Sequence, residues 1–163
     1  PPVVVGLIVY LFLSNAGPLG WMEILYSPTA MIIAQTILVA PIVAALSRQV
    51  VADLHAECAE QFRALAVPTR TAVAAMLWDA RHSLATVALA GFGRAIAEVG
   101  AVIIVGGNID HLTRVMTTAI ALETSKGNLA LALALGFILI VLALAVNAAV
   151  AILRGASERH ADA

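Results

Sequence analysis

The chain has 163 residues, of which 62% are hydrophobic and 12% are charged. Soluble domains are about 45–50% apolar and about 25% charged, so this composition is typical of a membrane protein. The formal net charge of −1 provides no basic field for nucleic acid. The lone cysteine, Cys58, excludes an intramolecular disulfide, and no His or Cys spacing indicates zinc. We therefore expect no metal, no other cofactor and no nucleic-acid partner.

Four apolar segments predict the secondary structure, since a transmembrane helix needs about 20 mostly apolar residues. They cover residues 3–13, 24–47, 83–109 and 127–153. The first is short and would span a bilayer only together with neighbouring residues. Pro41 lies inside the second and is expected to kink it. The sequence thus predicts an all-α, polytopic membrane protein with about four transmembrane helices.

The chain begins with Pro1-Pro2-Val3 and enters an apolar segment at once, with no Lys or Arg before it. This start lacks the basic region of a signal peptide. We therefore expect residues 1–163 to form a single transmembrane domain that is truncated at its N-terminus. Separately, we expect the lone cysteine, Cys58, to be a reduced thiol near the cytoplasm.

The basic residues predict the orientation of the chain. Arginines in the connection 48–81 and in the C-terminal tail would lie on one side of a four-span protein, and only Arg114 and Lys126 on the other. The first group is Arg48, Arg63, Arg70, Arg81, Arg154 and Arg159. Because cytoplasmic connections carry the excess of Lys and Arg, the long connection and the C-terminus are predicted to be cytoplasmic.

The long connection is predicted to contain two short helices, over 55–66 and 70–78, separated by Val67-Pro68-Thr69. The first is amphipathic. It is open to two interpretations: a solvated loop helix, or an element that offers an apolar stripe to a partner protein. In the second case a docking loop covers about 49–81, and its candidate residues are Glu57, Glu60, Phe62, Arg63, Leu65 and Ala66.

Two opposite charges, Arg94 and Glu98, lie midway along the apolar segment 83–109. A charge at bilayer depth costs about 2.5–3.5 kcal/mol by insertion scales. Spaced i, i+4 on a helix, the two side chains can form an ion pair. Surrounding small residues would let another helix approach, so the pair is either structural or part of a translocation path or gate.

Three segments of the sequence resemble a known family. The segment Glu60-Gln-Phe-Arg-Ala-Leu-Ala66 resembles a degenerate form of the Glu-Ala-Ala-x-x-x-Gly loop motif of binding-protein-dependent ABC importer permeases, with Ala66 in place of glycine. Residues 89–108, which contain Arg94 and Glu98, resemble the permeases of molybdate, sulfate and tungstate importers. Residues 117–127 are most similar to the tungstate branch.

The resemblance implies a permease subunit of about six spans, two of them missing here, in a bacterial or archaeal cytoplasmic membrane. It implies a homodimer that works by alternating access with a separate ATPase at the cytoplasmic loop and a secreted oxyanion-binding protein. The chain has no phosphate-binding Gly-x-x-x-x-Gly-Lys-Ser/Thr loop, so the ATPase activity would reside in the partner and this chain would not be an enzyme.

Two other classes remain open. An ion- or proton-coupled secondary transporter would use Glu98 as its titrating group, although the neighbouring Arg94 favours the ionised carboxylate. Such a transporter has no need of a partner-docking helix in the connection 48–81. A membrane enzyme is the third class, but the sequence offers no Ser/His/Asp arrangement, metal-ligand cluster or paired carboxylates at bilayer depth.

Overall fold

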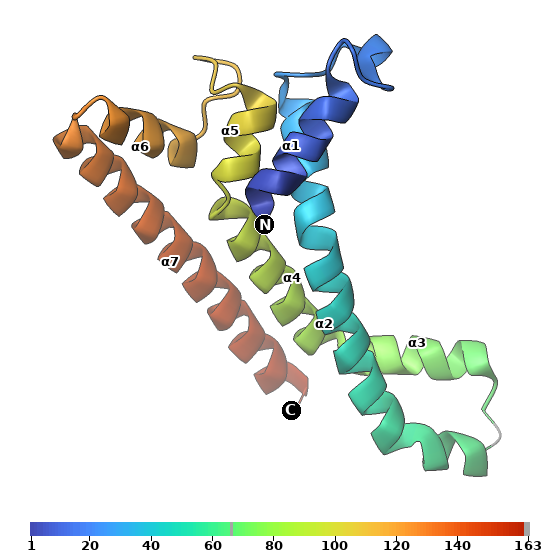
Figure 1. Ribbon diagram of the computed structural model, residues 1–163. Helices are drawn as coiled ribbons and strands as arrows, with labels where there is room; N and C mark the ends of the chain where they lie inside the picture. The colour runs from blue at the N-terminus through green and yellow to red at the C-terminus, as the bar shows by residue number, and fades with distance from the viewer. Residues whose placement is uncertain (66, 162–163) are drawn as a thin grey trace. The chain divides into compact units, whose positions relative to one another are not determined.

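The structure is a computed structural model that describes residues 1–65 and 67–161, and side chains as far as residue 148. Within these residues the secondary structure is helical, without a β-strand (Figure 1). The all-α prediction is confirmed. The helices are α1 (Pro2–Leu13), α2 (Pro28–Ala64), α3 (Thr69–Asp79), α4 (Arg81–Ile96), α5 (Gly100–Gly106), α6 (Met116–Ser125) and α7 (Leu129–Ala161), with one 3-10 turn at Gly20–Met22.

Two helices, α2 and α7, are long and apolar enough to cross a membrane. The helices α4 and α5 meet the same criterion only together, and they are bent by 60° at the break between them. The structure thus has two continuous spans, or three if the bent pair counts as one. At 12 residues, α1 is too short to span alone, so the expected count of four is not reached on length.

The helix α2 is longer than the sequence predicted. It runs for 37 residues, or about 55 Å, and includes most of the predicted span over 24–47 and most of the predicted separate helix over 55–66. The prediction of a separate helix was wrong because the residues between, 48–54, contain neither Pro nor Gly, the residues that most disfavour a helix. Pro41 lies inside α2 and does not end it. The second predicted helix, over 70–78, is confirmed as α3.

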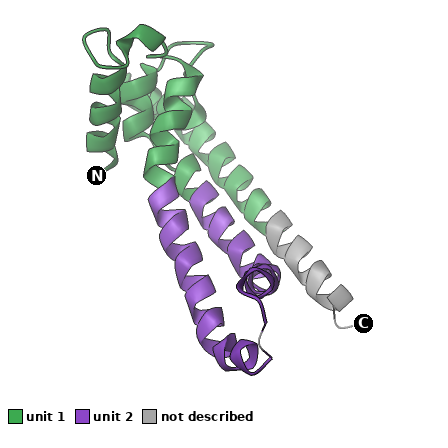
Figure 2. Ribbon diagram, turned by 90° about the vertical axis from the view of Figure 1, so that its right-hand side faces the viewer, with its two compact units in different colours: residues 1–39, 93–163 green, residues 40–92 purple. Residues whose placement is uncertain are grey.

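The described chain divides into two compact units (Figure 2). Unit 1 comprises Pro1–Val39 with Gly93–Ala163, and unit 2 comprises Ala40–Phe92. In unit 1, α1 packs against α5, and α6 packs against α7. The core of this unit gathers small and branched side chains from α1, α2 and α5: Val9, Leu13, Ala30, Ala34 and Val105.

Unit 2 consists of the C-terminal part of α2, the helix α3 and most of α4. Figures 1 and 2 both show α3 running across the direction of α2 and α4 rather than along it. Ala72 and Met76 are buried on the inner face of α3, and Ala80 is buried where the chain turns into α4. The end of α2 and α3 thus form a helical hairpin within this unit. A single residue, Ala80, joins α3 to α4, the first half of the bent candidate span.

Candidate functional site

The charged pair forms as the i, i+4 spacing predicted. The Nη1 atom of Arg94 lies 2.8 Å from Oε2 of Glu98. The two side chains differ in access, since that of Glu98 is 5% exposed and that of Arg94 is 35% exposed. The pair thus presents an accessible guanidinium group that is held by a buried carboxylate.

The pair does not lie in the middle of a continuous helix, so the prediction of one helix over 83–109 was wrong. Arg94 belongs to the last turn of α4, which ends at Ile96, and Glu98 precedes α5, which begins at Gly100. The Glu98 carboxylate oxygen Oε1 accepts a hydrogen bond from the backbone N–H of Ala101 at 3.1 Å. A carboxylate is favourable here because the first N–H groups of a helix lack partners within the helix.

Two further side chains satisfy carbonyl groups at the break. The Gln35 amide of α2 donates from Nε2 to the carbonyl oxygen of Ala95, at 3.2 Å. The Thr117 hydroxyl of α6 donates to the carbonyl oxygen of Glu98, at 3.3 Å. A broken helix is tolerated in a membrane only where its freed polar groups find partners. The break is therefore fixed from α2 and α6, as well as by Arg94 and Glu98 themselves.

Close helix packing supports the start of α5. A Cβ atom added to Gly6 of α1 would lie 2.7 Å from the Cα of Ala101, and one on Gly100 would lie 2.8 Å from a methyl group of Val3. These are the close approaches that small residues permit. Of the small residues around the charged pair, Gly100 and Ala101 take part in this packing, whereas Gly93 and Ala97 stay exposed.

Sequence reasoning did not identify Gln35 and Thr117 as part of this site. The available signal was weak: Gln35 is the one amide side chain within the apolar stretch 28–47 of α2. Thr117 sits beside Thr118, whose hydroxyl instead caps the start of its own helix by accepting the N–H of Val115. A sequence pattern does not show which of the two neighbouring threonines reaches the break.

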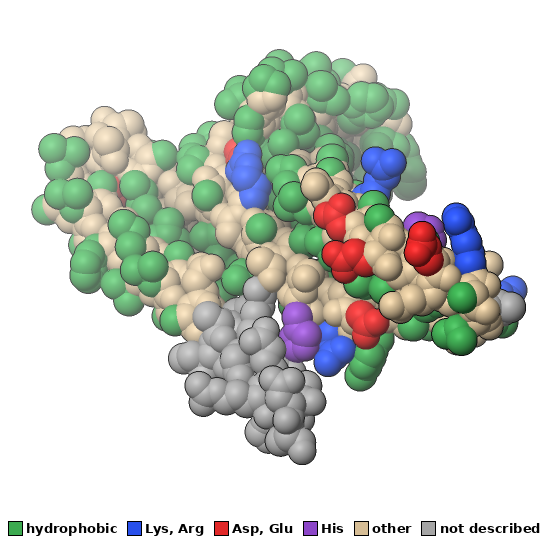
Figure 3. Space-filling view, turned by 90° about the horizontal axis from the view of Figure 1, so that it is seen from below, with side chains coloured by type: hydrophobic (Ala, Val, Ile, Leu, Met, Phe, Trp, Pro, Cys, Tyr) green, Lys and Arg blue, Asp and Glu red, His purple; other side chains and the backbone are tan. Residues whose placement is uncertain are grey.

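The candidate docking residues lie at the end of α2 in unit 2. Glu57, Glu60, Arg63 and Leu65 are exposed, whereas Ala66 lies outside the described residues. Figure 3 shows acidic and basic side chains gathered on the surface formed by α3 and the end of α2. The end of α2 carries mixed charge, as a solvated face does, and is followed by the apolar residue Leu65, which is 74% exposed.

Phe62 differs from the other docking candidates because it is half-buried. It lines a cleft of about 420 Å³ between α2 and α3, together with Ala72, Val73 and Met76. The residue therefore holds the hairpin together and does not form an outward apolar stripe with Leu65.

In the part of the chain that the structure describes, no three His, Cys, Asp or Glu side chains gather as a metal site would require.

The apolar helices and the broken span define a multi-pass membrane protein. Three curated proteins are similar to it. They are a probable anion ABC transporter permease protein of Haloferax volcanii, 44% identical over 153 residues, and two tungstate uptake system permease proteins TupB. The TupB of Peptoclostridium acidaminophilum is 41% identical over 150 residues, and that of Campylobacter jejuni is 40% identical over 147 residues.

These alignments cover 91%, 92% and 90% of this chain, respectively. They cover 66%, 66% and 62% of the relatives, so the chain spans just under two thirds of their length. No protein-family model matches the chain, and no solved structure matches it. Over about nine tenths of its length the chain is therefore similar to ABC transporter permease proteins, one described as an anion permease and two as tungstate uptake permeases.

Proposed function

We propose that the chain is the transmembrane part of a permease subunit that imports a tetrahedral oxyanion, with tungstate as the first candidate. The observation that carries this proposal is the identity of 40–41% to two tungstate uptake permeases over about nine tenths of the chain. The multi-pass helical fold is consistent with it.

The Arg94–Glu98 pair is the proposed gate or path-lining element. The guanidinium of Arg94 is the more accessible partner, and its planar set of donors fits oxyanion oxygens. Glu98 neutralises Arg94 when no anion is present. Because Glu98 also accepts the N–H of Ala101, it keeps one hydrogen-bond partner when Arg94 turns to an anion. The site thus binds an anion transiently without leaving a buried carboxylate unpartnered.

The geometry favours this role over proton coupling by Glu98. Both carboxylate oxygens of Glu98 accept hydrogen bonds, one from the Arg94 guanidinium and one from a backbone N–H. A protonated carboxyl group would have to give up one of these acceptor roles. A secondary transporter that uses Glu98 remains the alternative, and it predicts transport without ATP.

The end of α2 is the proposed docking element for a separate ATPase subunit. Residues 48–64 continue α2 for about 25 Å past its apolar part. They carry the exposed residues Glu57, Glu60 and Arg63, and the exposed Leu65 follows directly. The chain has no phosphate-binding loop of its own, so ATP hydrolysis belongs to the partner, and the permease is not an enzyme. Phe62 contributes by fixing the α2–α3 hairpin.

The remaining assignments follow from the proposed class. The permease works as a homodimer by alternating access and receives its anion from a periplasmic or extracellular binding protein. It lies in the cytoplasmic membrane of a bacterium or archaeon. By the positive-inside rule the arginine-rich hairpin and the C-terminus face the cytoplasm.

The proposal is tested by ATPase activity of the reconstituted full-length complex. A permease of this kind should raise ATP hydrolysis when the binding protein is loaded with tungstate, and less when the same protein is empty. A rate of ATP hydrolysis that is the same with the loaded and with the empty binding protein would contradict the proposal.

A further inference from the structure

The helix α3 has two different faces. Its inner face carries Ala72 and Met76, which are 8% and 6% exposed and pack inside the hairpin of unit 2. Its outer face carries Leu77 and Trp78, which are 47% and 69% exposed. An indole ring and a leucine side by side on a free helix face form an apolar surface that needs a cover.

Arginines flank this outer face. Arg70 and Leu77 share one side of α3 by their i, i+7 spacing, and Arg81 is the first residue of α4. Arg81 lies with its guanidinium carbon 4.7 Å from the Trp78 ring centroid, and its Nη1 donates to the Trp78 carbonyl oxygen at 2.7 Å. The one acidic residue of α3, Asp79, falls on the opposite side by the same geometry. The outer face is therefore apolar and positively charged.

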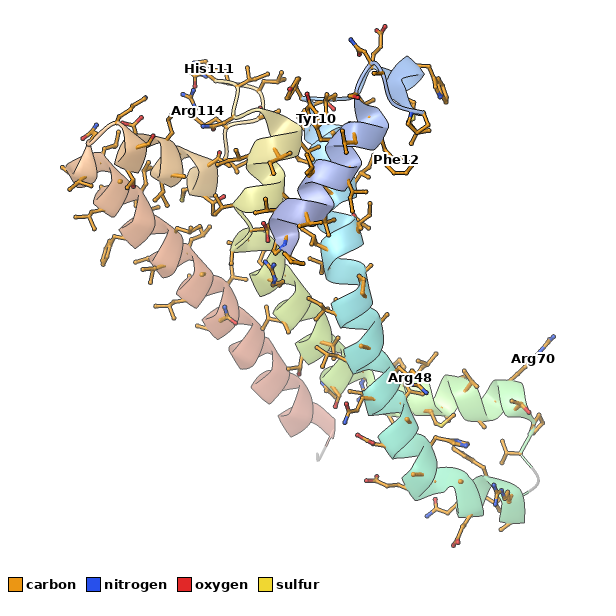
Figure 4. All side chains as sticks on the ribbon, viewed as in Figure 1. Tyr10, Phe12, Arg48, Arg70, His111 and Arg114 are labelled. Atoms are coloured by element: carbon orange, nitrogen blue, oxygen red, sulfur yellow. The ribbon has the colours of Figure 1, made fainter. Side chains whose placement is uncertain are left out.

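The position of α3 along the hairpin matches the edge of a bilayer. Residues 28–47 of α2 carry no charge and measure about 30 Å, the thickness of the hydrocarbon core. Arg48 follows as the first charged residue, and Figure 4 shows it level with α3, with Arg70 at the far end of that helix. A single residue, Ala80, then separates α3 from α4.

We propose that the outer face of α3 lies on anionic lipid headgroups at the membrane surface. Trp78 and Leu77 enter the interfacial layer, where tryptophan is enriched in membrane proteins. Arg70 and Arg81 bind the lipid phosphates, as basic residues beside a membrane do. The crosswise direction of α3 relative to α2 and α4 places the whole helix in the plane of that surface (Figure 1).

This contact sets the height of the hairpin relative to the bilayer. With α3 held at the headgroups, the exposed residues at the end of α2 project beyond the membrane surface. The inference does not depend on which anion is carried, nor on whether Arg94 lines the path.

The test uses Trp78 as its own reporter, since the sequence has one other tryptophan, Trp21. The full-length protein with Trp21→Phe, and with tryptophans outside this sequence also replaced, is placed in nanodiscs of mixed phosphatidylcholine and phosphatidylglycerol. Bromine atoms, which quench tryptophan emission, are attached either to phosphatidylcholine or to phosphatidylglycerol. The total amount of brominated lipid is the same in both preparations. We expect Trp78 emission to be lost with either lipid, and more with brominated phosphatidylglycerol.

A variant tests the charge. Arg70→Gln should reduce the difference between the two brominated lipids, whereas Arg63→Gln, at the end of α2, should leave it unchanged. Both arginines are exposed, so their loss leaves the hairpin core intact. Equal quenching by the two lipids in the unsubstituted protein would overturn the anionic contact.

Two other outcomes would also overturn the inference. Trp78 emission that is quenched by acrylamide in water but not by either brominated lipid would show a solvated face. Emission that is shielded from both quenchers only when an ATPase subunit is bound would show a protein partner on α3.

Discussion

The Glu98 carboxylate accepts the backbone N–H of Ala101 at 3.1 Å, so one side chain both caps α5 and holds Arg94 of α4. A bent span exposes polar backbone groups that lipid cannot satisfy. Here the acid that neutralises the arginine also stabilises the bend. The charge pair and the bend between α4 and α5 are therefore coupled, so a substitution that breaks the pair should also destabilise the bend.

This coupling predicts a graded response at Glu98. Glu98→Gln keeps a carbonyl oxygen for the Ala101 N–H, whereas Glu98→Ala removes both this cap and the partner of Arg94. We expect the alanine variant to lose about 3 kcal/mol of stability, and the glutamine variant clearly less. Thermal unfolding of the purified protein in detergent measures both. Equal losses in the two variants would show that the cap contributes nothing.

Loss of the guanidinium should impair transport. Arg94→Ala removes the accessible donors proposed to meet the anion, and we expect tungstate uptake to fall about tenfold or more. Arg114→Ala is the matched control, since Arg114 also makes an i, i+4 ion pair, with Asp110 at 2.7 Å, and its side chain is 31% exposed. Normal uptake by the Arg94→Ala variant would mean that the pair only packs the helices.

The proposed docking element can be probed at Leu65, which is exposed and makes no core contact. Leu65→Asp should weaken co-purification of the ATPase subunit and leave thermal stability unchanged. Leu112→Asp, which alters another exposed leucine in unit 1, serves as the control. If the Leu65→Asp variant co-purified with the ATPase subunit as well as the unsubstituted protein does, Leu65 would not be part of the interface.

Phe62 should behave differently from Leu65, because it lines the cleft between α2 and α3. A charge there would disturb the hairpin itself, so reduced ATPase binding by a Phe62→Asp variant carries no information on docking. The comparison of the two positions separates a surface effect from a folding effect.

Acid should weaken the junction between α6 and α7. A hydrogen bond from Lys126 lowers the pKa of Glu123 below its usual value of 4.5, and Asn128 adds a second one. The stability from this lowered pKa is present above the usual pKa and is lost as the pH falls through the lowered one. Glu123→Gln should therefore be less stable than the unsubstituted protein at neutral pH and equally stable in strong acid. A stability difference that persists in strong acid would contradict this assignment.

The sequence predicted the features that depend on local spacing. Length and apolar composition located α2 and α7, and the i, i+4 rule placed Arg94 against Glu98. It did not predict the break between α4 and α5. The carbonyl groups there are satisfied by Gln35, from a helix some 60 positions earlier, and by Thr117. Apolar periodicity carries no information on such distant hydrogen bonds.

The docking hairpin shows the same limit. Helical spacing grouped Phe62 with Leu65 because both recur on one apolar face. Which of them faces outward depends on where α3 packs, and α3 covers Phe62 with Ala72 and Met76. The uninterrupted length of α2 was also missed, since the charged residues after Ser47 mark the end of an apolar stretch but not the end of a helix.

Tungstate uptake into proteoliposomes tests the central claim most directly. The vesicles contain the full-length permease, its ATPase subunit and the loaded binding protein, with ATP supplied on the ATPase side and a protonophore present or absent. We predict accumulation that requires ATP and is unaffected by the protonophore. Accumulation that proceeds without ATP and collapses with the protonophore would contradict an ATP-driven permease and favour proton coupling through Glu98.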